Sequence, residues 1–510
     1  MKPNSINELL ADSTIFLTGV TGFIGGTLLE RILKTCPGPK KVYVLVRNKC
    51  DHDASDRVKQ ILSSPLFSDV KPERLQIVEI IPGDITVEGL GISASYKDLL
   101  ISTCTHVFHS AAYISFAAHL DLAIKINLVG ARNVLNLVKE MRKIQCMVHL
   151  STAYANCTKD RKPIIEEKLY PIIIDPNEFI NKTKNLSKEE IAKRTFEFLG
   201  NHPNTYTLTK QMAEHLMSRE KEGLALSIVR PGIVLNSWKE PIAGWVDNVN
   251  SGACGLIAGV SKGLFRTFQA NPNYLQDFIP VDMVVSTILA SALYAVRNPT
   301  QMHIFHCTSS SVNPTTYREY CKVVTKCSRE HPCRNVLWYP EIRPRSSYLR
   351  HTLVMYIFHM GPAYVIDFLR KLTNAKYKFP LLKLQQRFAK GTKYVSYFTT
   401  KQWTFSRVNA EKLFTTLPPN EITVHPMDPS IINWNEYFED CVLGTRKYYH
   451  KEPDRTTEEA RRRIMRLQVI SNLVPFLSFT VLWYITCWTG CSLTTGALLS
   501  AVVIIFMIWI

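Results

Sequence analysis

A glycine-rich turn near the start of the chain is the feature that most limits what this sequence can fold into. The apolar run 14–17 before it predicts a buried strand, and residues 27–33 after it have the spacing of a helix. Gly19 allows a tight turn, Gly22 lets a pyrophosphate approach the backbone, and Gly25 lets the helix pack closely on the strand. Because the start of a helix attracts phosphate, the turn predicts a dinucleotide site; the alternative is a structural glycine turn. The predicted contact residues are Thr18, Gly19, Thr21, Gly22, Phe23, Ile24 and Gly25.

Basic residues follow the second predicted strand, 41–46. Enzymes that prefer NAD usually place a carboxylate there for the ribose 2′-hydroxyl, whereas Arg47 and Lys49 suit the 2′-phosphate of NADP. A solvated strand end is the alternative. The third strand ends near Asp84, which we expect to meet the adenine amino group, and Ala111 in the fourth strand is expected on the nicotinamide side. The sequence therefore predicts NADP rather than NAD.

A tyrosine and a lysine four positions apart come later in the chain. Tyr206 and Lys210 begin a predicted helix, and residues at this spacing share one face. We expect the Lys210 ammonium to reach the nicotinamide ribose and to lower the pKa of Tyr206 from about 10, which makes the phenol a usable proton donor. Ser151 and Thr152 follow the fifth strand, 146–150, and the hydroxyl of one of them would hold the substrate oxygen. A surface Tyr–Lys pair is the alternative, but the order of these motifs favours a catalytic set.

Strand-like and helix-like runs alternate as far as residue 235, with a sixth strand at 226–231. This alternation predicts an α/β fold with a doubly wound parallel sheet that is covered by helices on both faces. The sheet is of the Rossmann type if the glycine turn binds a dinucleotide.

The chain has 510 residues, which is too long for one compact core. Its middle section is rich in aromatic and basic residues. Within it, the apolar stretch 352–369 contains Pro362 and Asp367, which favours a packed helical element over a membrane span. The predicted parts are a catalytic domain at 1–295, a helical C-terminal domain at 296–450 and an apolar tail at 467–510.

Charge and cysteine content limit the partners and the compartment. The formal net charge is +18, but the basic residues are dispersed apart from one cluster, so acidic ligands and a membrane surface fit better than nucleic acid. The 13 cysteines lack paired short spacings and the chain starts with polar residues, which predicts reduced thiols facing the cytosol. The sequence has no zinc-type spacing, so we expect no metal.

The tail 467–510 contains no charged side chain. Its first run, 467–488, is long enough to cross a hydrocarbon core, and its second run, 496–510, spans roughly 22 Å as a helix. We expect a membrane anchor of one span or a hairpin, and a buried helical hairpin is the alternative. The arginines just before it favour a cytosolic location for the rest of the chain. This basic cluster consists of Arg461, Arg462, Arg463 and Arg466.

Together these motifs resemble the extended short-chain dehydrogenases/reductases and, more narrowly, the alcohol-forming fatty acyl-CoA reductases. The resemblance extends from residue 13 to about residue 450. Two places depart from that family: Ala117 and Ala118 stand where an acidic residue is usual, and Gly232 stands where Ser is common. The broader resemblance is carried by the glycine turn, residues 151–155 and the Tyr206–Lys210 pair, and the narrower one by residues 44–47, 202–206, 230–231, 238–241, 244–245, 279–282, 362–364 and 403–405.

The resemblance implies that a long-chain fatty acyl-CoA is reduced to a fatty alcohol and CoA through an enzyme-bound aldehyde, with two NADPH consumed, for wax or ether lipid synthesis. It implies Tyr206, Thr152, Ser151 and Lys210 as the catalytic set. Alternatives are an enzyme of the same fold that stops at the aldehyde, a membrane-bound sterol dehydrogenase and an inactive binding protein. The expected location is the peroxisome membrane, with the endoplasmic reticulum as the alternative. Acyl chain length, CoA-binding residues and oligomeric state stay open.

Overall fold

The computed structural model describes most of the chain and divides it into two compact units that alternate along the sequence. The first unit comprises Met1–Ala253, Leu275–Thr315 and Gln402–Asn433, and the second comprises Cys254–Tyr274, Thr316–Lys401 and Trp434–Ile510. The described residues are 2–48, 53–160, 164–247, 252–373, 380–489, 492, 494–495, 497–498 and 500–501.

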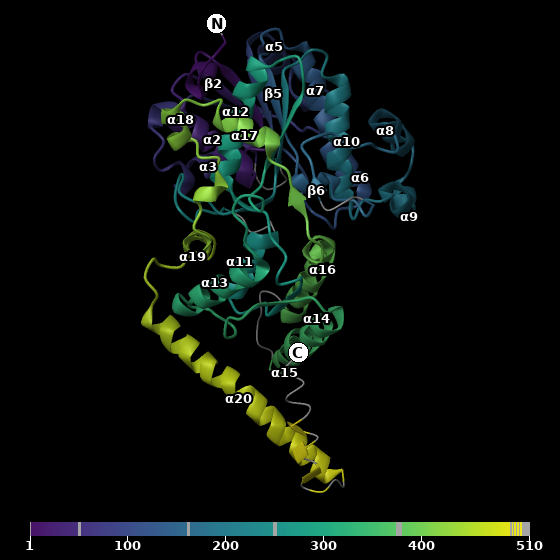
Figure 1. Cartoon of the computed structure of the whole chain (residues 1–510), viewed down its shortest axis with the longest axis vertical. Helices are drawn as coiled ribbons and strands as arrows, with labels where there is room; N and C mark the ends of the chain where they lie inside the picture. The colour runs from purple at the N-terminus through teal and green to yellow at the C-terminus, as the bar shows by residue number, and fades with distance from the viewer. Residues whose placement is uncertain are drawn as a thin grey trace. The chain divides into compact units, whose positions relative to one another are not determined.

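A parallel sheet forms the centre of the first unit (Figure 1). Its strands are β1 (Thr14–Thr18), β2 (Lys41–Val46), β3 (Val78–Pro82), β4 (His106–His109), β5 (Cys146–Leu150), β7 (Leu226–Pro231) and β11 (His303–Cys307). The order is β11-β7-β5-β4-β1-β2-β3, and every neighbouring pair is parallel. The direction of winding reverses between β1 and β4, so a crevice for ligands is expected beyond the carboxyl ends of these two strands.

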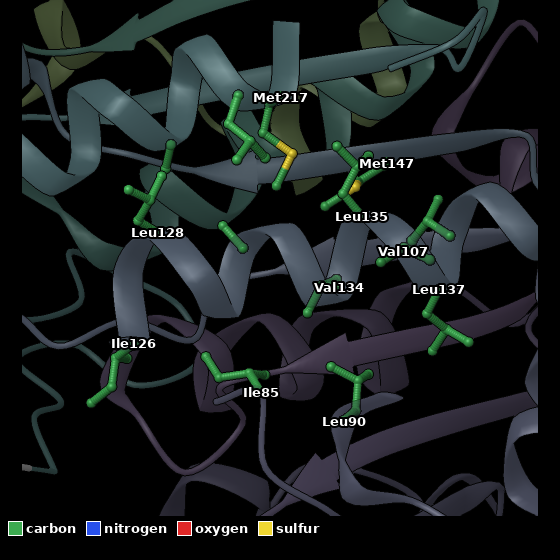
Figure 2. Packing of buried hydrophobic residues seen from close by; sticks show 14 of the residues in the cluster. Ile85, Leu90, Val107, Ile126, Leu128, Val134, Leu135, Leu137, Met147 and Met217 are labelled. Carbon is green, nitrogen blue, oxygen red and sulfur yellow. The ribbon is translucent and has the colours of Figure 1, made fainter. Parts of the chain in front are cut away.

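Helices cover both faces of the sheet, which confirms the predicted α/β class. One face packs on α5 (Ala94–Thr103), α7 (Gly130–Glu140) and α10 (Thr205–Glu220), and the other on α2 (Phe23–Thr35) and α12 (Val281–Arg297). Figure 2 shows the first interface, where Val134 and Leu135 of α7, Met217 of α10 and the strand residues Val107 and Met147 belong to one buried apolar cluster. Burial of each such side chain contributes about 1.5–3 kcal/mol, so this packing holds the strand ends in place.

The predicted strands 41–46, 146–150 and 226–231 coincide with β2, β5 and β7. The third strand ends earlier than expected, at Pro82, and Asp84 lies in the following turn, where its N–H donates to the Leu90 carbonyl at 2.7 Å. The fourth strand also ends early, at His109, so Ala111 lies beyond it.

The strand β11 lies beyond residue 295, where the sequence predicts the end of the catalytic domain. It pairs with β7 and forms one edge of the central sheet. The compact first unit thus draws on chain segments from both sides of that residue.

Smaller elements complete the first unit. The segment between Thr152 and Tyr206 contains the charged helix α9 (Lys188–Leu199), which begins with a capping box made by Ser187 and Glu190. The remaining helices are α1 (Ile6–Leu9), α3 (Ala54–Leu62), α4 (Pro72–Leu75), α6 (Leu120–Ala123), the π-helical turn η3 (Ile124–Val129), α8 (Pro176–Lys184), α17 (Val408–Phe414) and α18 (Pro419–Val424). Short strands pair as β6 (Ile164–Ile165) with β13 (Thr404–Phe405) and β8 (Ile233–Leu235) with β10 (Phe278–Pro280).

The second unit is mainly helical. Its short strands β9 (Thr267–Gln269) and β12 (Arg343–Arg345) pair with each other. Its helices are α11 (Gly252–Ser261), α13 (Tyr317–Glu330), α14 (Tyr348–Met355), the π-helical turn η5 (Tyr356–Met360), α15 (Gly361–Leu372), α16 (Leu381–Thr399), α19 (Trp434–Gly444), the π-helical turn η7 (Thr445–Tyr449) and α20 (Glu458–Trp488).

Two helices of the second unit are long and apolar enough to cross a membrane. The helix α20 has 31 residues, and its most apolar 18-residue window has a mean hydropathy of 1.6 and no buried residue. Most of the predicted second run, 496–510, lies outside the described residues. The other helix runs continuously from Tyr348 to Leu372, with only 22% of its apolar window buried. The sequence predicts a packed helical element here. One side of the helix is packed, but many of its large apolar side chains are exposed.

Candidate functional site

The glycine turn lies at the carboxyl end of β1, as the sequence predicts. Gly19 has a φ of +83°, which favours glycine, and a Cβ there would lie 2.6 Å from the Ala111 nitrogen. A Cβ on Gly25 would lie 2.2 Å from the Gly19 carbonyl oxygen, so only glycine permits this approach of α2 to the turn. Gly22 caps α2 without a side-chain hydrogen bond. This arrangement fits a bound pyrophosphate, since the first N–H groups of α2 have no side-chain cap.

Hydrogen bonds join the turn to the end of β4. The Thr18 hydroxyl lies 2.7 Å from Nδ1 of His109, and it accepts a hydrogen bond from the Ala111 N–H at 3.3 Å. Burial lowers the pKa of His109 to about 3, so its ring is neutral at physiological pH. Phe23 and Ile24, in the first turn of α2, are half-buried. Thr18 and Ala111 therefore lie side by side at the reversal point of the sheet.

Two arginines lie close together after the carboxyl end of β2. Arg47 forms an ion pair with Asp84, with 3.7 Å between Nη1 and Oδ2. Arg57, on α3, donates to the Arg47 carbonyl at 2.6 Å and to the Thr21 hydroxyl at 3.2 Å. Sequence reasoning missed Arg57, although it is a basic residue ten positions after Arg47. Lys49 lies outside the described residues.

The Tyr206 hydroxyl shares a hydrogen bond with the hydroxyl of Thr152. Thr152 follows β5 and is buried, whereas Tyr206, in the first turn of α10, is only partly buried. The Asn204 side chain fixes this end of α10, because its oxygen accepts the Thr207 N–H at 2.9 Å. The Phe116 ring lies against Tyr206, with 5.6 Å between ring centroids. The structure thus brings together two of the predicted catalytic side chains.

Lys210 lies one helical turn beyond Tyr206 and is buried. Its Nζ donates a hydrogen bond of 2.7 Å to the Leu150 carbonyl oxygen. Burial lowers the pKa of Lys210 to about 8, and the nearby Glu214 opposes that shift. The expected lowering of the Tyr206 pKa is wrong for this structure: burial raises that pKa, and the hydrogen bond with Thr152 offsets only part of the rise. Tyr206 therefore stays protonated near neutral pH.

Ser151 has a different set of contacts from Thr152. Its hydroxyl donates a hydrogen bond of 2.5 Å to Glu214, which is fully buried on α10. The same carboxylate accepts hydrogen bonds from Nε and Nη2 of the fully buried Arg230, at 2.8 and 2.6 Å. This buried group ties β5, α10 and β7 together, so it positions the strand end that carries Thr152.

Asn127 is a site residue that sequence reasoning missed. Its side chain accepts the Tyr113 N–H at 2.8 Å and donates to the Tyr113 carbonyl and the Thr209 hydroxyl, each at 3.1 Å. It thereby links the loop after β4 to α10, next to Tyr206 in sequence. In the sequence, Asn127 stands out only as an amide side chain among the mostly apolar residues 124–129.

The two departures from the family pattern lie on either side of this region. Ala117 and Ala118 follow Phe116, and the Ala118 carbonyl accepts a hydrogen bond from the Thr205 hydroxyl at 3.0 Å. At Gly232 a Cβ would lie only 2.4 Å from the Asp277 carbonyl oxygen. A serine at 232 therefore requires the Asp277 backbone to move in this chain.

One group of possible metal ligands occurs in the second unit. Ligand atoms of Cys327, His331 and Glu439 lie within 4.8 Å of one another. Burial raises the pKa of the Cys327 thiol to about 12, which keeps it protonated, and a protonated thiol is a poor ligand. None of these three residues belongs to the candidate site described above.

Comparisons with known proteins agree with this arrangement. Two family models with the description "Male sterility protein" match the chain, an NAD-binding model at residues 17–288 and a second model at residues 358–452. Fatty acyl-CoA reductase 1 of Xenopus laevis is 34% identical over 94% of this chain and 93% of its own length. Fatty acyl-CoA reductase 2 of Mus musculus is 34% identical over 94% of this chain and 92% of its own length.

Solved structures share the fold. The terminal R domain of the myxalamid PKS-NRPS pathway aligns with a TM-score of 0.57 at 18% identity, covering 85% of this chain and 90% of that domain. A reductase domain of a nonribosomal peptide synthetase from Mycobacterium tuberculosis aligns with a TM-score of 0.55 at 16% identity, covering 86% of this chain and 92% of that domain. With its Rossmann-type sheet and its close curated relatives, the chain belongs to the fatty acyl-CoA reductases, a family of nicotinamide-dependent oxidoreductases.

Proposed function

We propose that this protein reduces a long-chain fatty acyl-CoA to a fatty alcohol and free CoA in two steps, with NADPH as the reductant. The observation that carries the proposal is the hydrogen-bonded Tyr206–Thr152 pair, which lies at the carboxyl edge of a Rossmann sheet in a chain of this family. Binding alone does not require this Tyr–Thr–Lys set, so the inactive-protein alternative is disfavoured.

Tyr206 and Thr152 act on the substrate oxygen. NADPH, when bound over the glycine turn, supplies the hydride. As the thioester carbonyl becomes an oxyanion, the two hydroxyls donate hydrogen bonds to it. Collapse of this tetrahedral oxyanion expels CoA as its thiolate and leaves an aldehyde. In the second reduction Tyr206 transfers its proton to the alkoxide, and its raised pKa keeps that proton available at neutral pH.

Lys210 and Ser151 support this pair. Lys210 is held by the Leu150 carbonyl, one residue before Ser151, and its charge favours the phenolate that Tyr206 becomes after proton transfer. We assign the substrate-holding hydroxyl to Thr152 rather than Ser151, because the Ser151 hydroxyl is bonded to Glu214. Ser151 is then a positioning residue.

NADPH is favoured over NADH by the two arginines at the edge of the turn. Arg47 and Arg57 lie where the 2′-phosphate of NADP binds in doubly wound dinucleotide sites, and Lys49 adds a further basic residue in sequence. Asp84 pairs with Arg47, and we retain it as the residue that meets the adenine amino group. Thr18, Gly19, Thr21, Gly22, Phe23, Ile24, Gly25 and Ala111 complete the proposed cofactor site.

We also propose that residues 467–510 anchor the protein in a membrane, with the catalytic part in the cytosol. The exposed apolar helix α20 and the arginines at its start support this orientation. Both the acyl chain and the alcohol partition into lipid, so an anchor keeps the site near its substrate. The peroxisome membrane is the proposed location and the endoplasmic reticulum is the alternative. We retain 1–295 as the catalytic domain and 296–450 as the C-terminal domain of the family.

A product assay tests the proposal directly. The purified full chain is supplied with palmitoyl- or stearoyl-CoA and NADPH, and the products are identified by mass spectrometry beside the Tyr206→Phe variant. Fatty alcohol formed with two NADPH consumed per CoA released, and lost in the variant, supports it. Aldehyde as the only product points to the single-step reductase. No consumption of NADPH with either substrate contradicts acyl-CoA reduction and favours a sterol substrate.

A further inference from the structure

An exposed apolar surface covers the outer side of the helix Tyr348–Leu372. Single exposed apolar residues are normal on a soluble protein, but a contiguous set marks an interaction surface. On α15 the exposed members recur at one-turn spacing, so they form one face of the helix. We call this set the outer face of α14–α15. Its members are Tyr348 (65% exposed), Leu349 (66%), Tyr356 (64%), Tyr364 (62%), Val365 (52%), Phe368 (51%), Leu369 (53%) and Leu372 (66%).

The opposite side of the same helix is attached to its own unit. His351, Val354, Met355, His359 and Ala363 are buried. His351 Nδ1 lies 3.1 Å from the Thr267 hydroxyl of β9. One side of this helix is therefore packed against the rest of its own unit, and the opposite side is exposed.

The helix α16, which packs against α15, carries a basic stripe on its exposed side. Lys383, Arg387, Lys390 and Lys393 are exposed and recur at three- and four-residue intervals, so they lie on one side of α16 together with Tyr394. Between residues 348 and 401 every charged side chain except Asp367 is basic. Such a surface attracts anions.

Asp367, the one acidic residue in the sequence between positions 348 and 401, has a structural role. The Asp367 oxygens accept the Leu381 and Leu382 N–H groups at 3.0 and 2.9 Å, so Asp367 caps α16 and joins it to α15. These bonds fix the start of α16, the helix that carries the basic stripe, to α15, the helix that carries most of the apolar face. The combination of an apolar helix face that includes tyrosines and a flanking row of lysines and arginines is typical of a helix that lies in a membrane interface.

We propose that the outer face of α14–α15, with the basic stripe of α16, lies flat on an anionic phospholipid surface. The same compact unit carries α20, and the orientation of this face toward lipid rests on the proposed anchor. A crossing by α14–α15 is disfavoured, because its inner side is packed on protein and Asp367 would have to enter the hydrocarbon core. The face is thus a second contact that holds the second unit against the bilayer.

The test uses the full chain in lipid nanodiscs that contain an anionic phospholipid. An environment-sensitive fluorescent amino acid is placed at position 364 or 368, and as a matched control at position 196, where Phe196 on α9 is 82% exposed in the first unit. Lipids brominated either near the headgroup or near the chain end serve as quenchers. We expect quenching at 364 and 368, stronger from the shallow bromine, and none at 196.

Several results would overturn the proposal. Unquenched emission at 364 and 368 in chains that are inserted in nanodiscs means that the face does not meet lipid. A blue-shifted but unquenched emission means that protein, such as a second copy of the chain, covers it. Stronger quenching from the deep bromine means that the helix crosses the bilayer.

A charge-removal variant separates this proposal from the anchor. Changing Lys383→Gln together with Lys390→Gln is expected to shift the docked-to-undocked ratio at the bilayer by roughly 30-fold, since each surface charge near anionic lipid contributes about fivefold. The control pair Lys188→Gln and Lys193→Gln on α9 should change nothing. If the chain does not insert in nanodiscs, the anchor is wrong, and flotation with anionic vesicles then decides: flotation lost in the α16 variant supports the face, and absence of flotation refutes it.

Discussion

The hydroxyl of Ser151 donates a hydrogen bond of 2.5 Å to the buried carboxylate of Glu214. Its neighbour Thr152 instead shares a hydrogen bond with Tyr206. Two adjacent hydroxyls at one strand end therefore have separate tasks, one inside the protein and one toward the substrate.

This division predicts different effects of two alanine substitutions. Thr152→Ala should lower kcat by about 10²–10³, since it removes one donor to the developing oxyanion. Ser151→Ala should leave kcat within about threefold and cost roughly 1 kcal/mol of stability, because Glu214 keeps its bonds to Arg230. Steady-state kinetics and thermal melting of both variants check this. A larger loss of kcat in Ser151→Ala than in Thr152→Ala would reverse the assignment.

Removing the phenol should stop the chemistry without disturbing cofactor binding. For Tyr206→Phe we expect kcat to fall by about 10²–10⁴, the range of a lost general acid, with the Kd for NADPH unchanged. Turnover and NADPH fluorescence titration measure the two quantities. Tyr154→Phe is a matched control, because Tyr154 packs against Phe405 and lies outside the proposed pair. Retained turnover in Tyr206→Phe would exclude it as the proton donor.

Arg57 should set the preference for NADPH. Arg57→Ala is expected to raise the KM for NADPH by about tenfold or more, since charge-assisted bonds to phosphate contribute roughly 1.5–3 kcal/mol, and to leave the KM for NADH unchanged. Lys59→Ala, an exposed change on the same helix α3, is the control. Equal effects on the two cofactors would show that Arg57 supports the fold of the turn rather than the 2′-phosphate.

Glu30 should make the first unit less stable as pH rises. It is fully buried, and both of its carboxylate oxygens lack hydrogen-bond partners among the described residues. Burial raises its pKa from 4.5 to about 7, with Arg31 opposing the shift. The folded protein therefore holds a proton that the unfolded chain releases above pH 4.5, so stability falls as pH rises from about 4.5 to 7, by roughly 3 kcal/mol at most.

Glu30→Gln removes that titration. The melting temperature of the variant minus that of the parent should increase from pH 5 to pH 8. Most of this increase should be complete by about pH 7. Scanning calorimetry in detergent at both pH values measures it. A difference that does not change with pH would mean that Glu30 is already charged in the folded protein.

Removal of residues 467–510 should convert the protein from an integral to a peripheral membrane protein. The truncated chain loses most of the apolar part of α20 and should be extracted by alkaline carbonate, whereas the full chain should resist extraction. Fractionation of cell membranes with and without carbonate makes the comparison. Carbonate resistance in the truncated chain would contradict the anchor.

The central sheet could be predicted because its strands before residue 235 are short, mostly apolar runs that alternate with helices of regular spacing. The strand β11 was missed because it lies after this alternation has ended, and its place in the sheet depends on its pairing with β7, which is remote in sequence. The His306 ring is accommodated by Ser406, whose carbonyl lies 2.8 Å from its Nδ1, and by Arg230. These partners are remote in sequence, so a local sequence pattern cannot predict them.

The candidate site was predictable to the level of residue types and order, but not of contacts. The glycine turn and the Tyr–Lys spacing are local features that fix a backbone path or a helix face. The choice between Ser151 and Thr152 depends on Glu214, which is 63 positions away. The pKa of Tyr206 depends on burial, which the spacing to Lys210 does not report.

The N-terminal helix of the first unit depends on a residue near the end of that unit. Glu421 accepts hydrogen bonds from the Ile6 and Asn7 N–H groups at 2.7 and 3.0 Å, and the first of these pairs is separated by 415 positions. At a synthesis rate of 5–20 residues per second, the start of the chain waits roughly 20–80 s for this partner to leave the ribosome. During that interval the nascent first unit lacks the Glu421 carboxylate at the start of α1, and until residue 307 is made it also lacks the edge strand β11.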